Sequence, residues 1–238
     1  MARRGRKKGG GLARWLFRAI AIVVLVGVAF AAWLWWDMRS WRPDSGHYPE
    51  QGAEIGPHPV QLNFKTLKAV GADFVYLRLE HDPRALDDDF FDRFRRANEA
   101  GLKVGIVLQF NPCIPADPQS AYFTQMVPRD EALLRPAVEL TRTADKCATP
   151  VSDAAIESEL FILINQIEQH AGKAVIIKLG EQFQERYGTA GTTARDLWLI
   201  RDRARPAYAG RPWLLWSANS QLVTEASSEP VEWVVVQK

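Results

Sequence analysis

The sequence predicts an α/β fold, a small irregular (β/α) barrel, preceded by one transmembrane helix. Three observations lead to this prediction. Eight short apolar segments recur along the chain, helical patterns separate several of them, and an uncharged run follows a strongly basic amino terminus. Apolar segments that alternate with helical patterns are typical of a parallel sheet. The 238 residues, 47% of them hydrophobic, are enough for one domain core but marginal for two.

The amino-terminal segment is typical of a membrane anchor. Residues 1–18 contain seven Lys and Arg and no acid, and residues 19–36 contain no charge. An apolar run of this length, ending in a Trp cluster, just crosses the hydrocarbon layer, and its basic flank stays in the cytoplasm. A signal peptide cleaved after Ala29-Phe30-Ala31 is the alternative, although the apolar run continues past that site into bulky Trp33. We expect a single-pass inner-membrane protein whose carboxyl-terminal domain faces the periplasmic or extracellular side.

The predicted organisation has four parts. Residues 1–18 form a basic head, 19–36 the transmembrane anchor, 37–47 a tether without apolar periodicity, and 48–238 the barrel domain. Without the seven basic residues of the head, 23 Lys and Arg face 28 Asp and Glu, so the remainder is acidic. No basic patch with interleaved aromatic residues stands out in that remainder. We therefore expect no nucleic-acid partner.

Eight candidate strands are rich in Val, Ile, Leu or aromatic residues. They are residues 51–55, 74–79, 103–109, 136–140, 174–178, 197–200, 213–217 and 231–236. Helical patterns lie at residues 60–70, 89–100 and 152–170, with Gly71 and Gly101 as stop signals and Ser152 as a cap. At about 190 residues the domain is smaller than a usual barrel of this kind, so some connections must be short or non-helical.

The two cysteines, Cys113 and Cys147, lie on either side of the fourth candidate strand in polar, turn-forming surroundings. In an exported chain we expect them to form a disulfide. Two reduced core thiols are the alternative. The four histidines have neither metal-ligand spacing nor Cys companions, so we expect no metal site and no cofactor. They are His47, His58, His81 and His170.

The fourth candidate strand ends beside a carboxylate, and chemistry in a barrel takes place where strands end. Its sequence, Arg135-Pro136-Ala137-Val138-Glu139-Leu140-Thr141, resembles the Pro-Ala-Val-Asp-Leu-Glu strand of some lysozymes of glycoside hydrolase family 25. In this register Glu139 replaces the family's Asp, and Thr141 replaces its proton-donating Glu. Sliding the register to make Glu139 the donor would put Ala137 at the Asp position. Either register leaves one carboxylate where the family has two.

Two further strands carry the resemblance, which extends from Tyr48 to the carboxyl end. Gln51-Gly52-Ala53-Glu54-Ile55 is similar to the family's opening Gln-Gly-Ile-Asp-Val, and Pro230-Val231-Glu232 is similar to its closing Pro-Val-Asp. The resemblance implies a barrel of the family 25 lysozyme type. It also implies peptidoglycan as the substrate, N-acetylmuramidase-like chemistry, and Glu54, Glu139 and Glu232 as the candidate catalytic residues.

The departures from the family fall on residues that carry chemistry. Glycoside hydrolysis ordinarily needs a protonated carboxyl group and a second carboxylate, and the hydroxyl of Thr141 is far too weak an acid to replace the first. Val107-Leu108 also stands in place of the family's Tyr-His. We expect a lysozyme-like protein directed at peptidoglycan whose hydrolysis is weak or lost. The alternative is a non-catalytic domain that binds a glycan or an envelope protein. Mutual repulsion among the three Glu would favour catalysis by raising one pKa, whereas burial of all three against Arg would oppose it.

Overall fold

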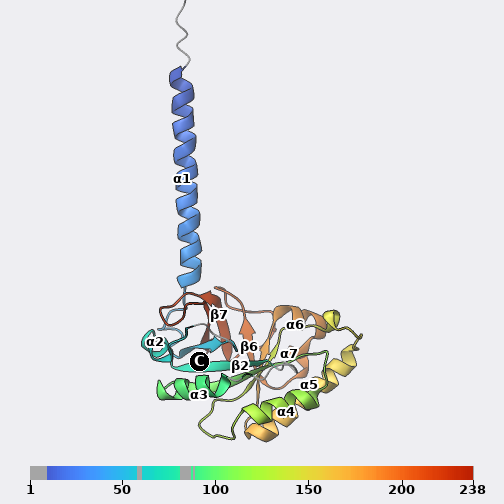
Figure 1. The fold of residues 1–238 in the computed structure, drawn as a ribbon. Coiled ribbons are helices and arrows are strands. Elements are labelled where there is room, and N and C mark those ends of the chain that lie inside the picture. The colour runs from blue at the N-terminus through green and yellow to red at the C-terminus, as the bar shows by residue number, and fades with distance from the viewer. Residues whose placement is uncertain (1–9, 58–60, 81–86, 88, 238) are drawn as a thin grey trace, which may run out of the picture. The chain divides into compact units, whose positions relative to one another are not determined.

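The computed structural model describes residues 10–57, 61–80, 87 and 89–237. The chain divides after Ser40 into two units, of which the first contains the single helix α1 (Gly10–Ser40), blue in Figure 1. Its segment Arg14–Ser40 is long and apolar enough to cross a membrane, a test that a signal sequence also passes. The helix continues through the first four residues of the predicted tether. The functional boundaries assigned to head, anchor and tether remain predictions.

The second unit contains a closed eight-stranded barrel in which consecutive strands are neighbours. The strands are β1 (Gln51–Ile55), β2 (Phe74–Glu80), β3 (Lys103–Gln109), β4 (Ala137–Leu140), β5 (Ile176–Leu179), β6 (Asp196–Ile200), β7 (Leu215–Leu222) and β8 (Val231–Val236). Strands β1 to β7 run parallel to one another, and β8, which closes the barrel between β7 and β1, is antiparallel to both. All eight predicted strands are therefore confirmed, with shifts at their ends.

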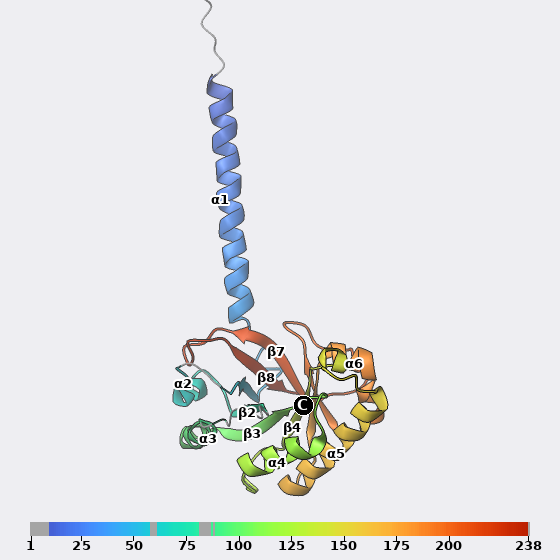
Figure 2. The ribbon, with the colours of Figure 1, turned by 45° about the vertical axis from the view of Figure 1, so that its right-hand side comes forward.

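Helices lie outside the strands, as Figure 2 shows for α3, α4 and α5. Three were predicted from the sequence: α2 (Phe64–Ala69), α3 (Phe90–Glu99) and α5 (Asp153–Ala171). Residue 60, the first of the predicted 60–70 pattern, lies outside the described residues. The helices α4 (Ala116–Met126), α6 (Glu181–Tyr187) and α7 (Thr189–Thr192) and the 3-10 turn η1 (Ala144–Lys146) were not predicted. As expected, the Ser152 hydroxyl caps α5 by accepting a hydrogen bond from the Ala155 amide, at 3.3 Å.

The interior of the barrel is filled by two layers of inward-facing side chains. The lower layer is apolar and consists of Phe74, Tyr76, Val107, Ala137, Ile176, Trp198, Leu215 and Val234. Gly52 and Gly105 make room for its two largest rings on β2, because a Cβ at either position would collide with Phe74 or Tyr76. The upper layer, at the carboxyl ends of the parallel strands, is polar. A well-packed apolar floor thus supports a polar mouth.

No helix occurs between β6 and β8, where every residue is described, so the outer face of β7 and β8 needs another cover. The segment that follows α1 supplies it. Trp41 and Tyr48 pack against Trp216 of β7, with ring centroids 6.3 and 5.7 Å apart. On β8, the Trp233 ring lies 5.1 Å from the guanidinium of Arg42. Part of the segment predicted as a tether is therefore packed against the barrel.

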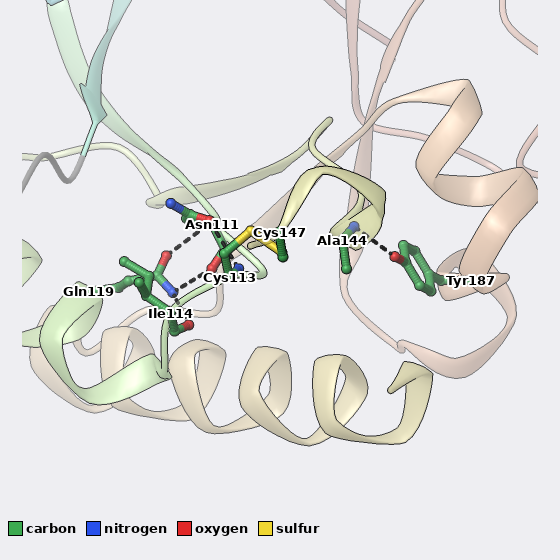
Figure 3. Close-up of a disulfide and its surroundings, with 7 residues drawn as sticks. All are labelled: Asn111, Cys113, Ile114, Gln119, Ala144, Cys147 and Tyr187. Atoms are coloured by element: carbon green, nitrogen blue, oxygen red, sulfur yellow. Dashed lines mark hydrogen bonds between the residues drawn. A yellow bond between two sulfur atoms is a disulfide. The ribbon is translucent and has the colours of Figure 1, made fainter. Parts of the chain in front are cut away.

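The predicted disulfide between Cys113 and Cys147 is confirmed (Figure 3). It joins the loop after β3 to the turn after β4, with 34 residues of sequence separation. Neighbouring hydrogen bonds hold both sides. The buried Gln119 amide donates to the carbonyls of Asn111 and Ile114, and the Tyr187 hydroxyl accepts from the Ala144 amide. The rim of the barrel above β3 and β4 is thereby fixed.

Candidate active site

The three Glu predicted from the sequence meet in the upper layer of the barrel. Because side chains alternate along a strand, seven of the eight strands each contribute one inward polar group at this level. These groups are Glu54 (β1), Arg78 (β2), Gln109 (β3), Glu139 (β4), Lys178 (β5), Ser217 (β7) and Glu232 (β8). β6 contributes no polar group at this level, but the indole of its floor residue Trp198 donates to the Ser217 hydroxyl at 2.7 Å.

Lys178 lies at the centre of this cluster. Its Nζ is 2.5 Å from Glu54 Oε2, 2.8 Å from Glu232 Oε1 and 3.4 Å from Glu139 Oε2. The side chain is only 1% exposed, and Nζ lies 5.0 Å from the centre of the Trp198 ring. A single buried cation therefore occupies the space between the three carboxylates.

Arg78 forms a second bridge across the same three carboxylates. Its Nε is 2.6 Å from Glu54 Oε1 and 3.2 Å from Glu139 Oε2, and its Nη2 is 3.4 Å from Glu232 Oε2. The Arg78 side chain is 23% exposed and that of Glu232 is 14% exposed, so these two reach the opening. Glu54 and Glu139, by contrast, are sealed beneath them.

Thr141, at the position of the family's proton donor, faces Glu139. Its hydroxyl donates a hydrogen bond to Glu139 Oε1 at 2.8 Å, and the Gln109 amide nitrogen lies 3.4 Å from both groups. Val107 belongs to the apolar floor, and Leu108 is buried on the opposite face of the same strand. None of these groups offers an acidic proton toward the opening.

The charges in the cluster shift the pKa values of the two buried Glu in opposite directions. Burial raises the pKa of Glu54 from 4.5 to about 7, assisted by the negative charges of Glu232 and Glu139 and opposed by Lys178 and Arg78. Burial also acts to raise the pKa of Glu139, but Lys178, Arg78 and the Thr141 hydrogen bond outweigh it and lower that pKa. The same carboxylates raise the pKa of Lys178 against its own desolvation, so it stays charged.

Glu54 thus has a pKa suitable for a general acid, but its carboxyl group is not accessible to a substrate from the barrel opening. Its side chain is 1% exposed, and both carboxyl oxygens contact Arg78 or Lys178. A cavity of about 330 Å³ lies beside it, lined by residues of β1, the following loop and the segment that leads into β8. This volume is near the lower end for ligand pockets, roughly 300–1,000 Å³. Of the three candidate carboxylates only Glu54 lines the cavity.

Sequence reasoning found the three Glu but missed both cations. Arg78 and Lys178 were each placed in a candidate strand, 74–79 and 174–178, without a role. Each is a lone charge within an apolar strand, in Val75-Tyr76-Leu77-Arg78-Leu79 and in Ile176-Ile177-Lys178-Leu179. Buried charges need partners. That rule predicts acidic partners for both side chains, although it does not say which acids they are.

The fold and the cluster together define a class of protein. A closed barrel of mostly parallel strands with carboxylates where the strands end is the architecture of barrel glycosidases. The model of the glycosyl hydrolases family 25 matches residues 55–224, and the chain belongs to this family. The resemblance to family 25 is therefore confirmed, and of the three motifs only that of β4 lies wholly within the matched residues.

Solved structures agree at the level of the fold. A family 25 glycosyl hydrolase from Bacillus anthracis superposes with a TM-score of 0.74 at 19% identity, covering 84% of this chain and 93% of that one. The bacterial lysozyme from Streptomyces coelicolor gives a TM-score of 0.70 at 17% identity, covering 79% and 92%. A family GH25 lysozyme from Aspergillus fumigatus gives 0.63 at 17% identity, covering 79% and 94%. No curated protein sequence matches the chain.

Proposed function

We propose that the chain is a membrane-anchored family 25 domain directed at peptidoglycan, in which hydrolysis is very weak or lost. The observation that supports this proposal most strongly is the position of Lys178 Nζ between Glu54, Glu139 and Glu232. We propose peptidoglycan as the target because the chain belongs to this family. The loss of hydrolysis comes from the geometry of this chain.

Retaining and inverting glycosidases both place a sugar, and in the inverting case also a water, between two carboxyl groups. Here Glu54 and Glu139 lie 2.5 and 3.4 Å from the same nitrogen, so neither can approach a glycosidic oxygen from the space between them. Catalysis also needs a group that donates a proton within hydrogen-bond reach of that oxygen. Thr141 is not such an acid, and Glu54, whose pKa is suitable, is covered.

The membrane-anchored part of the proposal is supported by the amino terminus. Seven basic residues precede the uncharged run, α1 is long enough to span, and the disulfide suits an exported domain. Mass spectrometry of the mature protein tests it. We expect an intact amino terminus, whereas a mature chain that begins near Ala32 would contradict the anchor.

Release of reducing ends from purified peptidoglycan tests the catalytic part. The full chain in detergent should release no more than its Glu139→Gln variant, which serves as a control for contaminating lysozyme. Introducing Glu139→Asp and Thr141→Glu together should not restore turnover while Lys178 remains. Adding Lys178→Met to that pair should permit it, provided that circular dichroism shows the triple variant folded. Robust wild-type turnover that disappears in Glu139→Gln would refute the proposal.

The sealed carboxylates also favour a second candidate, a domain that binds glycan without cleaving it. Co-sedimentation of the full chain with insoluble peptidoglycan tests whether the domain binds this polymer. Both candidate functions require such binding, whereas a domain that recognises another partner does not. Retention without release of reducing ends would support glycan binding. If the chain stays in the supernatant, peptidoglycan is not its ligand.

A further inference from the structure

The loop between β6 and β7 concentrates positive charge in a domain that is otherwise acidic. Residues 201–214 contain Arg201, Arg203, Arg205 and Arg211 against the single acid Asp202. The Asp202 carboxylate accepts hydrogen bonds from the amide and the hydroxyl of Ser220, at 2.6 and 2.9 Å. Arg201 and Arg205 are exposed, and within the described part of the chain neither forms an ion pair with an acid. The loop is therefore a local positive feature.

Two tryptophans from distant parts of the chain complete this feature. The Arg203 guanidinium lies 5.8 Å from the centre of the Trp41 ring, and the Arg205 guanidinium lies 5.5 Å from that of Trp213. Both Trp rings contact Trp216, and the Asn219 amide donates to the Trp41 carbonyl at 2.9 Å. We call the surface formed by Trp41, Arg201, Arg203, Arg205 and Trp213 the Arg–Trp face. The Arg residues and Trp213, which lie within residues 201–213, were overlooked in the sequence, whereas Trp41 joins them only on folding.

Chain connectivity brings one residue of this face, Trp41, directly after the last residue of α1. The uncharged run ends at Trp36, and α1 ends four residues later at Ser40. Four helical residues rise about 6 Å, which matches the roughly 5–7 Å depth of one headgroup layer. Trp41 is the next residue and therefore emerges at headgroup level. Within the barrel unit, Trp41 contacts Arg203 of the basic loop.

From these observations we propose that the Arg–Trp face docks on the anionic phospholipid headgroups of the outer leaflet, on the side to which the domain is exported. This inference rests on the membrane anchor of the proposed function and adds to it a second, electrostatic attachment. Trp favours the membrane interface, and the guanidinium group binds phosphate oxygens in bidentate fashion. Each Arg near an anionic surface contributes about fivefold in binding, so two exposed Arg should contribute about 25-fold. The domain would then contact the membrane through this face as well as through its transmembrane helix.

The test uses the full chain reconstituted into nanodiscs of phosphatidylcholine alone or of equal parts phosphatidylcholine and phosphatidylglycerol. Hydrogen–deuterium exchange of residues 201–213 is followed by mass spectrometry. We expect slower exchange in the anionic discs and a loss of this slowing at high salt. The variant Arg201→Gln/Arg205→Gln should reduce the ratio of docked to undocked protein about 25-fold. The control variant Arg95→Gln/Arg129→Gln, which neutralises two exposed Arg elsewhere, should behave as wild type.

Three results would overturn the inference. Equal exchange in both kinds of disc, in protein that has incorporated, would remove the lipid contact while leaving the anchor intact. Protection that grows with protein concentration in pure phosphatidylcholine discs would indicate a second copy of the chain as the occupant. A chain that does not co-purify with discs at all would refute the anchor itself and the inference with it.

Discussion

The raised pKa of Glu54 predicts an unusual dependence of stability on pH. A carboxyl group whose pKa is higher in the folded than in the unfolded state binds its proton more tightly when folded. Glu54 should therefore add stability as the pH falls through about 7, and this contribution should be complete below 4.5, its ordinary value. Most proteins with paired carboxylates behave in the opposite way.

The magnitude follows from the shift. One pKa unit corresponds to about 1.4 kcal/mol, so the change from 4.5 to about 7 is worth about 3 kcal/mol when fully developed. Between about pH 8 and pH 5 most of that, about 2 to 3 kcal/mol, should appear. Glu139 acts in the opposite sense, because its lowered pKa stabilises the fold above 4.5 and this contribution is lost at lower pH. Stability should therefore be greatest near about pH 5.

Urea unfolding of the full chain in a neutral detergent, followed by Trp fluorescence at a series of pH values, measures this dependence. The Glu54→Gln variant cannot titrate at this position, so its profile should be flat between about pH 5 and pH 8. Glu225→Gln, which changes an exposed carboxylate, should keep the wild-type profile. Wild-type stability that falls as the pH drops from 8 toward 5, or a Glu54→Gln variant with the wild-type slope, would show that the charge balance around Glu54 is misread.

Two further predictions concern the barrel interior. Lys178→Met should lower the free energy of unfolding by about 3 to 5 kcal/mol at neutral pH, because it leaves buried carboxylates without their central cation. The exposed control Lys65→Met should change it little in the same urea titration, and equal effects would contradict the central role of Lys178. Gly105→Ala should cost about 1 to 3 kcal/mol, since the added methyl group collides with the ring of Tyr76. Gly191→Ala, where a Cβ meets nothing within 4 Å, is its control, and a harmless Gly105→Ala would show that the apolar floor is loosely packed.

The strands were predictable because the local composition of each strand indicates that it is buried. Each is a short apolar run, and a run of that kind needs no long-range information to be recognised. The helix α4 was missed because its pattern is masked by polar residues that are buried. Gln119 is fully buried, yet it is satisfied by the carbonyls of Asn111 and Ile114, which lie near it only after folding. β7 was ended too early for a similar reason, since Ser217 and Asn219 are polar residues that are buried.

The candidate site was predictable only in part. The motifs on β1, β4 and β8 located three carboxylates: Glu54 and Glu139 lie one residue before the ends of β1 and β4, and Glu232 lies one residue after the start of β8. Whether those carboxylates would face solvent or cations depended on Arg78 of β2 and Lys178 of β5. These two residues contact Glu54 but follow it by 24 and 124 residues in the sequence. Alternation along β5 places Lys178 on the same face as Ile176 of the floor, so its inward direction was available from the sequence. Its three partners were not, because they come from three different strands.

The seven-member polar layer also constrains how this sequence can change over generations. Removing Lys178 or Arg78 alone leaves negative charge buried, and removing one Glu alone leaves positive charge less well paired, so single steps in the layer carry penalties of several kcal/mol. A domain has only about 5 to 15 kcal/mol of stability in total. Replacing Lys178 alone therefore removes a large share of that stability. An open pair of carboxylates at this position therefore requires coordinated substitutions on several strands.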